Sequence, residues 1–157
     1  MAKKKSGKSN TPKTISNRRA RHDYTIEDGL IVGIQLSGAE TKALRHGHGQ
    51  LRGAYVMVKD NELWLINATI SPMPGIPISE SDQTRSRKLL AKRKEIDKLL
   101  ATKQQGRTIV PLEILTRGRY IKVRIAAGKG KKLYDKRETL KKRTTKLDID
   151  RDIKSRI

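Results

Sequence analysis

Short runs of alternating apolar residues constrain the fold of this 157-residue chain more than any other feature. Every second side chain of a strand points to the same face, so alternation predicts half-buried strands. Such runs cover residues 25–36, 51–59, 62–70, 107–116 and 119–127. Residues 59–61 (KDN) join the second run to the third and residues 117–118 (RG) join the last two, which is typical of hairpins. Because these connections are too short for parallel crossovers, we expect a mainly β protein with five or six antiparallel strands, closed as a small barrel of the oligonucleotide-binding (OB) kind.

Two or three helices are expected beside the strands. Ser37 and Glu40 have the spacing of a capping box, in which each side chain bonds the backbone amide of the other, so a short helix is predicted over 39–45. Glu40 has a second interpretation, as an acceptor for a base edge or a ribose hydroxyl of RNA beside Lys42 and Arg45.

The longest helix of the body is predicted over residues 84–104. Its apolar residues recur near helical spacing at Leu89, Ile96, Leu99 and Leu100. Arg85, Arg87 and Lys88 fall in its first two turns, where positive charge opposes the helix dipole and needs another reason to be present. These cations belong either to a solvated face or to a nucleic-acid contact, and both interpretations remain open.

Charge is distributed unevenly along the chain. There are 37 Lys and Arg residues against 16 Asp and Glu, and the net charge of +21 favours a polyanionic partner. Residues 1–16 are polar and basic and are expected to form a disordered arm. Residues 17–128 are expected to form the barrel domain. Residues 129–157 form a basic tail that we expect to stay disordered until a partner neutralises it.

The junction of barrel and tail, residues 126–137, combines two glycines at alternate positions with clustered cations. Gly128 and Gly130 allow the backbone to approach a partner closely, and the cations suit phosphate groups. A solvated linker is the alternative interpretation. Tyr134 favours binding, because an aromatic ring among cations is suited to stacking on an exposed base.

The sequence shows no motif typical of an enzyme or of a metal-binding protein. Without cysteine, a disulfide framework and a thiolate zinc site are impossible. His46 and His48 lack a third ligand at suitable spacing, so no metal is expected there. Residues 128–131 lack the spacing and the hydroxyl residue of a P-loop, and no constellation of nucleophile, histidine and acid stands out. We therefore expect no enzyme activity and no cofactor.

The ends of the chain give no sign of membrane association. No apolar stretch follows the lysine-rich start, so neither a secretory signal nor a membrane span is expected. The basic ends also lack an amphipathic face that could insert into a bilayer. We expect a soluble, cytoplasmic protein.

Four sequence blocks stand together in a specific order. They are residues 17–24 (NRRARHDY), 38–45 (GAETKALR), 84–90 (TRSRKLL) and 128–137 (GKGKKLYDKR). On these blocks the chain resembles the SmpB family of SsrA-binding proteins, from residue 17 to residue 143. The resemblance implies an OB-like barrel that binds the tRNA-like part of transfer-messenger RNA (tmRNA, or SsrA RNA). It also implies delivery of this RNA, without catalysis by the protein, to ribosomes stalled on messages that lack a stop codon.

The resemblance assigns residues to partners. Its RNA-binding positions are Asn17, Arg19, Arg21, His22, Tyr24, Glu40, Lys42, Arg45, Arg85, Arg87, Lys88, Leu90 and Lys129. Its tail positions at the ribosomal decoding centre are Lys131, Lys132, Tyr134, Asp135, Lys136 and Arg137. The implied partners are tmRNA, the ribosome with its small-subunit RNA, and elongation factor Tu through the charged tmRNA, with the protein acting as a monomer.

Three departures from the family pattern are visible. Ile31 stands two before Gly33, where an acidic residue is usual, so one polar contact to RNA is missing or replaced. Thr41 and Ala43 replace a valine and a serine, which are mild changes. Gln83 replaces a proline, so the start of the following helix is less fixed by backbone geometry.

A different function class shares much of this sequence character. A ribosomal structural protein or a general RNA chaperone would have the same charge, barrel and disordered ends, but would not explain the ordered blocks. Co-purification separates the two, because a ribosomal protein should follow ribosomal RNA at fixed stoichiometry. A nuclease is more distant, and loss of an RNA substrate with magnesium would indicate it.

Overall fold

A computed structural model of the chain describes residues 14–155, and its body is built on a seven-stranded sheet. In order of neighbours, the strands are β1 (Ile15–Ser16), β8 (Thr108–Leu115), β4 (Tyr55–Lys59), β5 (Glu62–Ile66), β7 (Arg87–Leu90), β2 (Tyr24–Ile34) and β9 (Lys122–Gly130). A separate pair is formed by β3 (Gly49–Gln50) and β6 (Thr69–Ile70). All of these described pairings are antiparallel, so the predicted mainly β, antiparallel architecture is confirmed.

The pairings of the sheet form a closed circuit. β8 pairs with β9 as well as with β4, so the hydrogen-bonded order runs from β8 through β4, β5, β7, β2 and β9 back to β8. The core lies inside this circuit and is filled by buried aliphatic side chains, among them Val56, Leu63, Leu65, Leu89, Val123 and Ile125. The alternating runs of the sequence therefore supply one shared core.

Turn geometry sets which residues of the β4–β5 hairpin face the core. Asp60 and Asn61 both have positive φ, at 51° and 59°, which is the backbone of a two-residue type I′ turn. In the resulting register Leu63 and Leu65 are fully buried, and Trp64 between them lies half-buried on the opposite face. Because Leu63, Trp64 and Leu65 are all apolar, the sequence pattern alone does not choose between the two faces.

The predicted helix over 84–104 is wrong in its first part. Residues 80–83 form the one-turn helix α3 (Glu80–Gln83), residues 87–90 form strand β7, and only α4 (Arg93–Gln104) corresponds to the expected helix. Along β7, Arg87 and Leu89 are buried whereas Leu90 is exposed, which is a period of two. β7 fills the place between β5 and β2, and these long-range pairings outweigh the local helical spacing.

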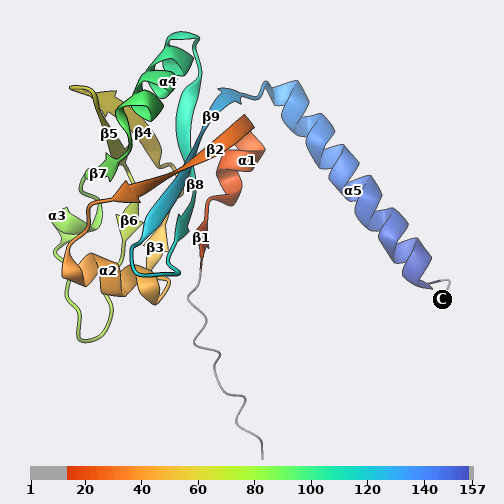
Figure 1. Cartoon of the computed structure of the whole chain (residues 1–157). Helices are drawn as coiled ribbons and strands as arrows, with labels where there is room; N and C mark the ends of the chain where they lie inside the picture. Colours follow the sequence, from red (N-terminus) through yellow and green to blue (C-terminus); the bar gives the residue numbers. More distant parts are fainter. Residues whose placement is uncertain (1–13, 156–157) are drawn as a thin grey trace, which may run out of the picture.

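Two short helices lie on different sides of the body. Helix α1 (Arg18–Asp23) lies near the start of the C-terminal helix, whereas α2 (Gly38–Arg45) lies near α3 on the other side (Figure 1). α2 confirms the short helix predicted over 39–45. Its buried apolar residues, Ala43 and Leu44, join the main core.

Strands extend past both predicted limits of the body. Ile15 and Ser16 form β1 against β8, so the expected disorder of residues 1–16 is wrong at these two positions, while residues 1–13 lie outside the described residues. At the other end β9 continues to Gly130, and Lys129 pairs with Thr25 of β2. The last strand thus runs two residues beyond the expected boundary at residue 128.

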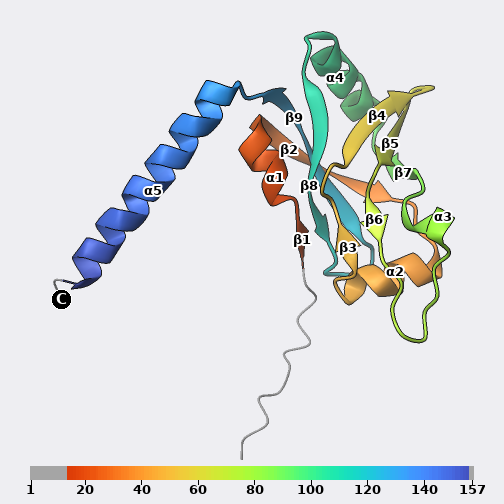
Figure 2. The same ribbon diagram turned by 180° about the vertical axis from the view of Figure 1, so that it is seen from behind.

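Helix α5 (Leu133–Ser155) projects away from the body (Figures 1 and 2). It is 23 residues long and none of its residues is buried. Its large apolar side chains, Leu133, Leu140, Leu147, Ile149 and Ile153, are all exposed. Because they do not gather into one stripe, α5 has no apolar face with which to pack on the sheet. Disorder of this segment before ribosome binding remains a prediction.

Candidate nucleic-acid interface

The predicted RNA-binding residues fall into two groups. The first, here called the α1 surface, contains Asn17, Arg19, Arg21, His22, Tyr24 and Lys129 on α1 and the adjoining ends of β2 and β9. The second, here called the α2–β7 surface, contains Glu40, Lys42, Arg45, Arg85, Arg87, Lys88 and Leu90. Figures 1 and 2 show α1 on the side of α5, and α2 with β7 on the other side of the body.

Asn17 fixes the position of α1. Its side-chain oxygen accepts a hydrogen bond from the Ala20 amide at 3.2 Å, which is the N-cap contact. Its side-chain amide donates to the Pro111 carbonyl at 3.0 Å, and its backbone amide donates to the Leu112 carbonyl at 2.7 Å. Asn17 is buried, so this geometry favours a role in holding α1 on β8 over direct contact with RNA.

Asp23 gathers the cations of the α1 surface. Its carboxylate lies 3.0 Å from His22 Nδ1, 3.1 Å from Lys136 Nζ and 3.3 Å from Arg19 Nε. The contact with His22 contributes most to lowering the pKa of Asp23 from 3.8 to about 2; partial burial opposes this shift, and Lys136 and Arg19 add to it. The Asp23 carbonyl also accepts a hydrogen bond from the Lys131 amide at 2.8 Å. Asp23 therefore links α1 to the beginning of α5.

Sequence reasoning missed Asp23 as a functional residue. The signal was its isolation, since it is the only acidic residue among residues 1–26. A single carboxylate within a basic run is well placed to hold its neighbours in position. Arg21 and Lys129 remain exposed beside it, and His22 is half-buried.

Tyr24 is seated against a glycine of the neighbouring strand. A Cβ atom at Gly128 would lie 2.9 Å from Tyr24 Cβ and 3.3 Å from the Thr25 carbonyl oxygen, so a larger residue would displace the tyrosine. Tyr24 packs on a small second core that contains Ala20 and Val110. The close approach expected at Gly128 is therefore made by the protein's own β2.

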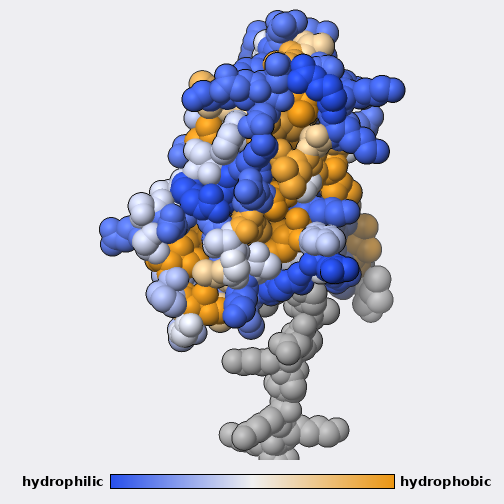
Figure 3. Space-filling model, turned by 60° about the vertical axis from the view of Figure 1, so that its left-hand side comes forward, coloured by the Kyte–Doolittle hydropathy of each residue, from blue (hydrophilic) through white to orange (hydrophobic). Residues whose placement is uncertain are grey.

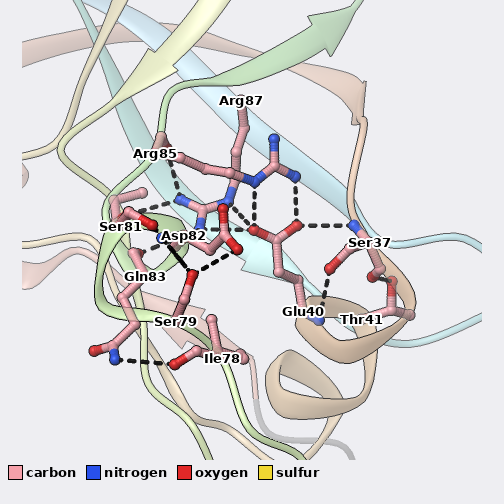
Figure 4. A network of polar contacts seen from close by, with 11 residues as sticks. Ser37, Glu40, Thr41, Ile78, Ser79, Ser81, Asp82, Gln83, Arg85 and Arg87 are labelled. Atoms are coloured by element: carbon pink, nitrogen blue, oxygen red, sulfur yellow. Dashed lines mark hydrogen bonds and ion pairs between the residues drawn. The ribbon is translucent and has the colours of Figure 1, made fainter.

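Glu40 lies at the centre of the α2–β7 surface (Figure 4). Ser37 Oγ accepts a hydrogen bond from the Glu40 amide at 3.3 Å, and Glu40 Oε2 accepts one from the Ser37 amide at 2.8 Å, so the predicted capping box is confirmed. Arg85 donates to both carboxylate oxygens, at 2.8 Å and 2.7 Å, and Arg87 Nε donates to Oε1 at 3.0 Å. With Glu40 only 1% exposed, the carboxylate is not accessible to an RNA base edge.

The electrostatics of this cluster keep Glu40 charged. Burial alone would raise the pKa of Glu40, but the hydrogen bonds from Arg85 and the Ser37 amide, together with the charge of Arg87, outweigh burial and lower the pKa from its ordinary value. The bond to Glu40 raises the pKa of Arg85. Burial lowers the pKa of Arg87 against the opposing charge of Glu40, but a guanidinium keeps its proton at neutral pH, so the three side chains form an ionised network.

Arg87 is a buried structural cation. Its side chain is fully buried, and within residues 14–155 its acceptors other than Glu40 are backbone carbonyls. These are Ala68 at 2.9 Å, Arg85 at 3.0 Å, Asp82 at 2.7 Å and Gln83 at 3.2 Å. Direct contact of Arg87 with RNA, as the family resemblance implied, has no access route in this conformation. The guanidinium instead ties β7 to α2, α3 and the connection between β5 and β6.

Other residues of the α2–β7 surface remain accessible. Lys42 is exposed, the side chain of Arg85 is about one-third exposed, and Lys88 pairs with Glu62 of β5 at the surface. Arg45 differs, because its guanidinium donates to three carbonyls of the β8–β9 connection, at 3.2, 3.1 and 2.9 Å. Arg45 therefore positions that connection.

The departure at Ile31 enlarges an apolar part of this surface. Gly33 pairs with Leu90, and Ile31 lies two residues from Gly33, so Ile31 and Leu90 share the outer face of β2 and β7. Both are exposed. Figure 3 shows apolar patches between hydrophilic side chains on the side of the body that carries β5 and β7. Ile31 thus supplies apolar surface where the family usually has a carboxylate.

The predicted tail residues lie at the start of α5. Lys131 Nζ donates to the Arg21 carbonyl at 3.1 Å, and the Lys132 amide donates to the Asp135 carboxylate at 3.3 Å. Tyr134 and Arg137 are exposed. The structure therefore places Lys131 and Lys136 next to the α1 surface, with Tyr134 open to solvent.

Metal and membrane binding find no further sign in the structure. Across residues 14–155, no group of three or more His, Cys, Asp and Glu side chains is placed to hold a metal ion. Within the same residues, no helix combines the length and apolar character needed to cross a membrane.

Comparison with known proteins gives a consistent result. The family model described as SmpB protein matches residues 14–155. An SsrA-binding protein of Clostridium kluyveri is 44% identical over 150 residues, covering 95% of this chain and 96% of that protein. One of Trichormus variabilis is 46% identical over 153 residues, covering 96% and 99%. One of Staphylococcus aureus is 44% identical over 158 residues, covering 99% of each.

A solved structure is also similar. A chain from "tmRNA-SmpB: a journey to the center of the bacterial ribosome" superposes with a TM-score of 0.64 at 40% identity, covering 76% of this chain and 85% of that one. The match of the family model extends over the sheet, both candidate surfaces and α5. The chain belongs to the SmpB family.

Proposed function

We propose that this protein binds the tRNA-like part of tmRNA (SsrA RNA) and delivers it to stalled ribosomes for trans-translation. The observation that carries the proposal is the SmpB family match from residue 14 to residue 155, which includes both the body and α5. The named relatives are SsrA-binding proteins, and the similar solved chain comes from work on tmRNA-SmpB in the bacterial ribosome. A net charge of +21 suits these RNA partners.

Within this function, the two surfaces of the body contact RNA and the start of α5 contacts the decoding centre. The RNA contacts are made by the accessible members of each surface, such as Arg21 and Lys129 on the first and Lys42 and Leu90 on the second. Buried members of the family motifs, above all Arg87, keep these accessible residues in place. Exposure of Tyr134 and Arg137 supports their contact with ribosomal RNA.

The remaining features of the proposal follow from the fold and the family. The closed circuit of strand pairings supports an OB-like barrel. The protein acts as a monomer without catalysis of its own, and it meets elongation factor Tu through the charged tmRNA. Its place of action is the cytoplasm, where the ribosomes to be rescued are found.

The test is to sequence the RNA that a tagged copy retains after a salt wash. We expect enrichment of one tRNA-like RNA. A second measurement uses purified protein and the tRNA-like RNA. For the double variant Lys42→Ala, Lys88→Ala, the slope of log affinity against log salt should fall by up to about 0.9 per lost phosphate contact. Lys94→Ala with Lys98→Ala on α4 removes the same charge and should leave the slope unchanged. Retention of ribosomal RNA alone, at fixed stoichiometry, would contradict the proposal.

A further inference from the structure

A groove that shares Asn17, Arg19 and Tyr24 with the α1 surface also contains two residues, Arg52 and Tyr55, that the proposed function does not use. It lies between α1 and the start of β4 and has a volume of about 540 Å³. The buried residues Ala20, Ala54 and Val110 line it with apolar surface. Its polar and aromatic lining includes Arg19, Tyr24, Arg52 and Tyr55. Arg52 and Tyr55 belong to none of the four sequence blocks that resemble the SmpB family.

Two arginines give this groove a positive charge. Arg52 is exposed and precedes Gly53, whose φ of +76° makes the turn into β4. Among residues 14–155, Arg52 has no hydrogen-bond or ion-pair partner. The side chain of Arg19 is 59% exposed and contacts the Asp23 carboxylate through Nε. Asp23 also lines the groove, but Arg19 and Lys136 pair with its carboxylate and offset its charge.

Two tyrosines complete the groove. Tyr55 is 39% exposed on β4, and Tyr24 packs closely against Gly128 of β9. Aromatic rings, an apolar lining and nearby guanidinium groups are the combination that binds an unstacked RNA base together with its phosphate. The volume of about 540 Å³ falls within the range of about 300 to 1,000 Å³ for small-ligand sites and suits one nucleotide. A paired helix would keep its bases stacked and could not use this lining.

The position of the groove identifies the source of the nucleotide. Asp23 lines the groove and is bound by Lys136 of α5 at 3.1 Å and by the Lys131 amide at 2.8 Å. The groove therefore adjoins the segment that the proposed function directs to the decoding centre. Building on that function, we infer that this groove holds one unpaired nucleotide of small-subunit ribosomal RNA, with Tyr55 stacking on the base and Arg52 binding a phosphate.

The experiment measures binding of full-length protein to two probes, purified small ribosomal subunits and the isolated tRNA-like fragment of tmRNA. Tyr55→Leu keeps apolar bulk but removes the aromatic face, so it should weaken subunit binding by about tenfold without changing its salt dependence. Arg52→Gln should weaken subunit binding and reduce the salt slope by roughly 0.7 to 0.9. Neither change should alter affinity for the tRNA-like fragment.

Control variants separate this role from loss of folding or of general charge. Tyr55→Phe keeps the ring and should bind subunits as the parent does, with the same melting temperature as Tyr55→Leu. Tyr120→Leu and Arg117→Gln alter an exposed tyrosine and an exposed arginine at the β8–β9 connection, outside the groove, and should also bind as the parent does.

Parental subunit binding by Tyr55→Leu would overturn the inference. Equal weakening toward both probes would overturn the ribosomal source of the nucleotide. If the parent protein binds neither probe, the proposed function fails, and the inference fails with it.

Discussion

Glu40 and Asp23 both gather cations, but in different surroundings. Glu40 is almost completely buried and pairs with Arg85 and with the buried Arg87 inside the body. The side chain of Asp23 is 26% exposed and pairs with Lys136, which belongs to a helix without buried residues. A buried pair has given up its hydration, so separating it leaves an unpaired charge, whereas an exposed pair exchanges with water at little cost.

The two clusters join different parts of the molecule: one lies within the body, and the other connects the body to the tail. The Glu40 cluster joins α2 to β7, the strand that pairs with both β5 and β2. The Asp23 cluster joins the body to the first turns of α5. We therefore expect the first cluster to determine stability and the second to determine only how α5 leaves the body.

The largest effect on stability is expected for Glu40→Gln. Glutamine can still serve the capping box, so the change isolates the loss of the charge opposite Arg87. Breaking a buried pair by removing one partner lowers the free energy of unfolding by about 3 to 5 kcal/mol, which urea denaturation would measure. The control is Glu62→Gln at the exposed Lys88 pair, where we expect less than about 1 kcal/mol. Equal effects of the two changes would contradict the structural role of Glu40.

Acid should weaken the body through the same carboxylate. The pKa of Glu40 is lower in the folded protein than in the unfolded chain, so its stabilising contribution is complete above the unfolded value of about 4.3. The contribution is lost as the pH falls through the folded pKa, because the unfolded state then binds more protons. Thermal melts should show a steeper loss of stability below about pH 4 for the parent than for Glu40→Gln. If the stability of the parent and of Glu40→Gln fell equally with pH, groups other than Glu40 would cause the loss of stability in acid.

Asp23→Asn should have a smaller effect. We expect less than about 1 kcal/mol in the free energy of unfolding, because the ion pairs lie at the surface. Amide hydrogen exchange in the first turns of α5 should become faster, since the contact with Lys136 is weakened. The folded pKa of Asp23 is about 2, so its contribution is present above pH 3.8 and disappears between there and about pH 2. The control is Asp97→Asn, which weakens an exposed pair on α4 and should leave α5 unchanged.

Local signals in the sequence predicted the elements whose partners are close along the chain. The turns at residues 59–61 and 117–118 place their strands side by side, and Ser37 and Glu40 are three residues apart, so neighbouring residues were enough. The family blocks then predicted which residues form the candidate site, and that prediction still has to be tested. They could not separate the accessible members from those that hold the accessible ones in place.

Long-range pairing explains what could not be predicted. β7 is a strand because it pairs with β5 on one side and with β2 on the other. Arg87 can be buried because Glu40 pairs with it, and this partner lies 47 residues earlier in the chain. Spacing within residues 84–104 carries no information on either contact. The sequence of β7 is polar at Arg87 and Lys88 and apolar at Leu89 and Leu90, so the period of two appears only in the burial of the folded strand.

The most direct test of the separation between body and tail is a chain that ends at Gly130. β9 ends at this residue and α5 buries none of its own, so the free energy of unfolding should change by less than about 1 kcal/mol in calorimetry. Gel shift should show retained binding of the tRNA-like RNA, while peptide tagging on a stop-less message in a reconstituted system should be lost. Tagging at the full rate, or loss of the cooperative melting transition, would contradict an RNA-binding body joined to a separate, ribosome-directed helix.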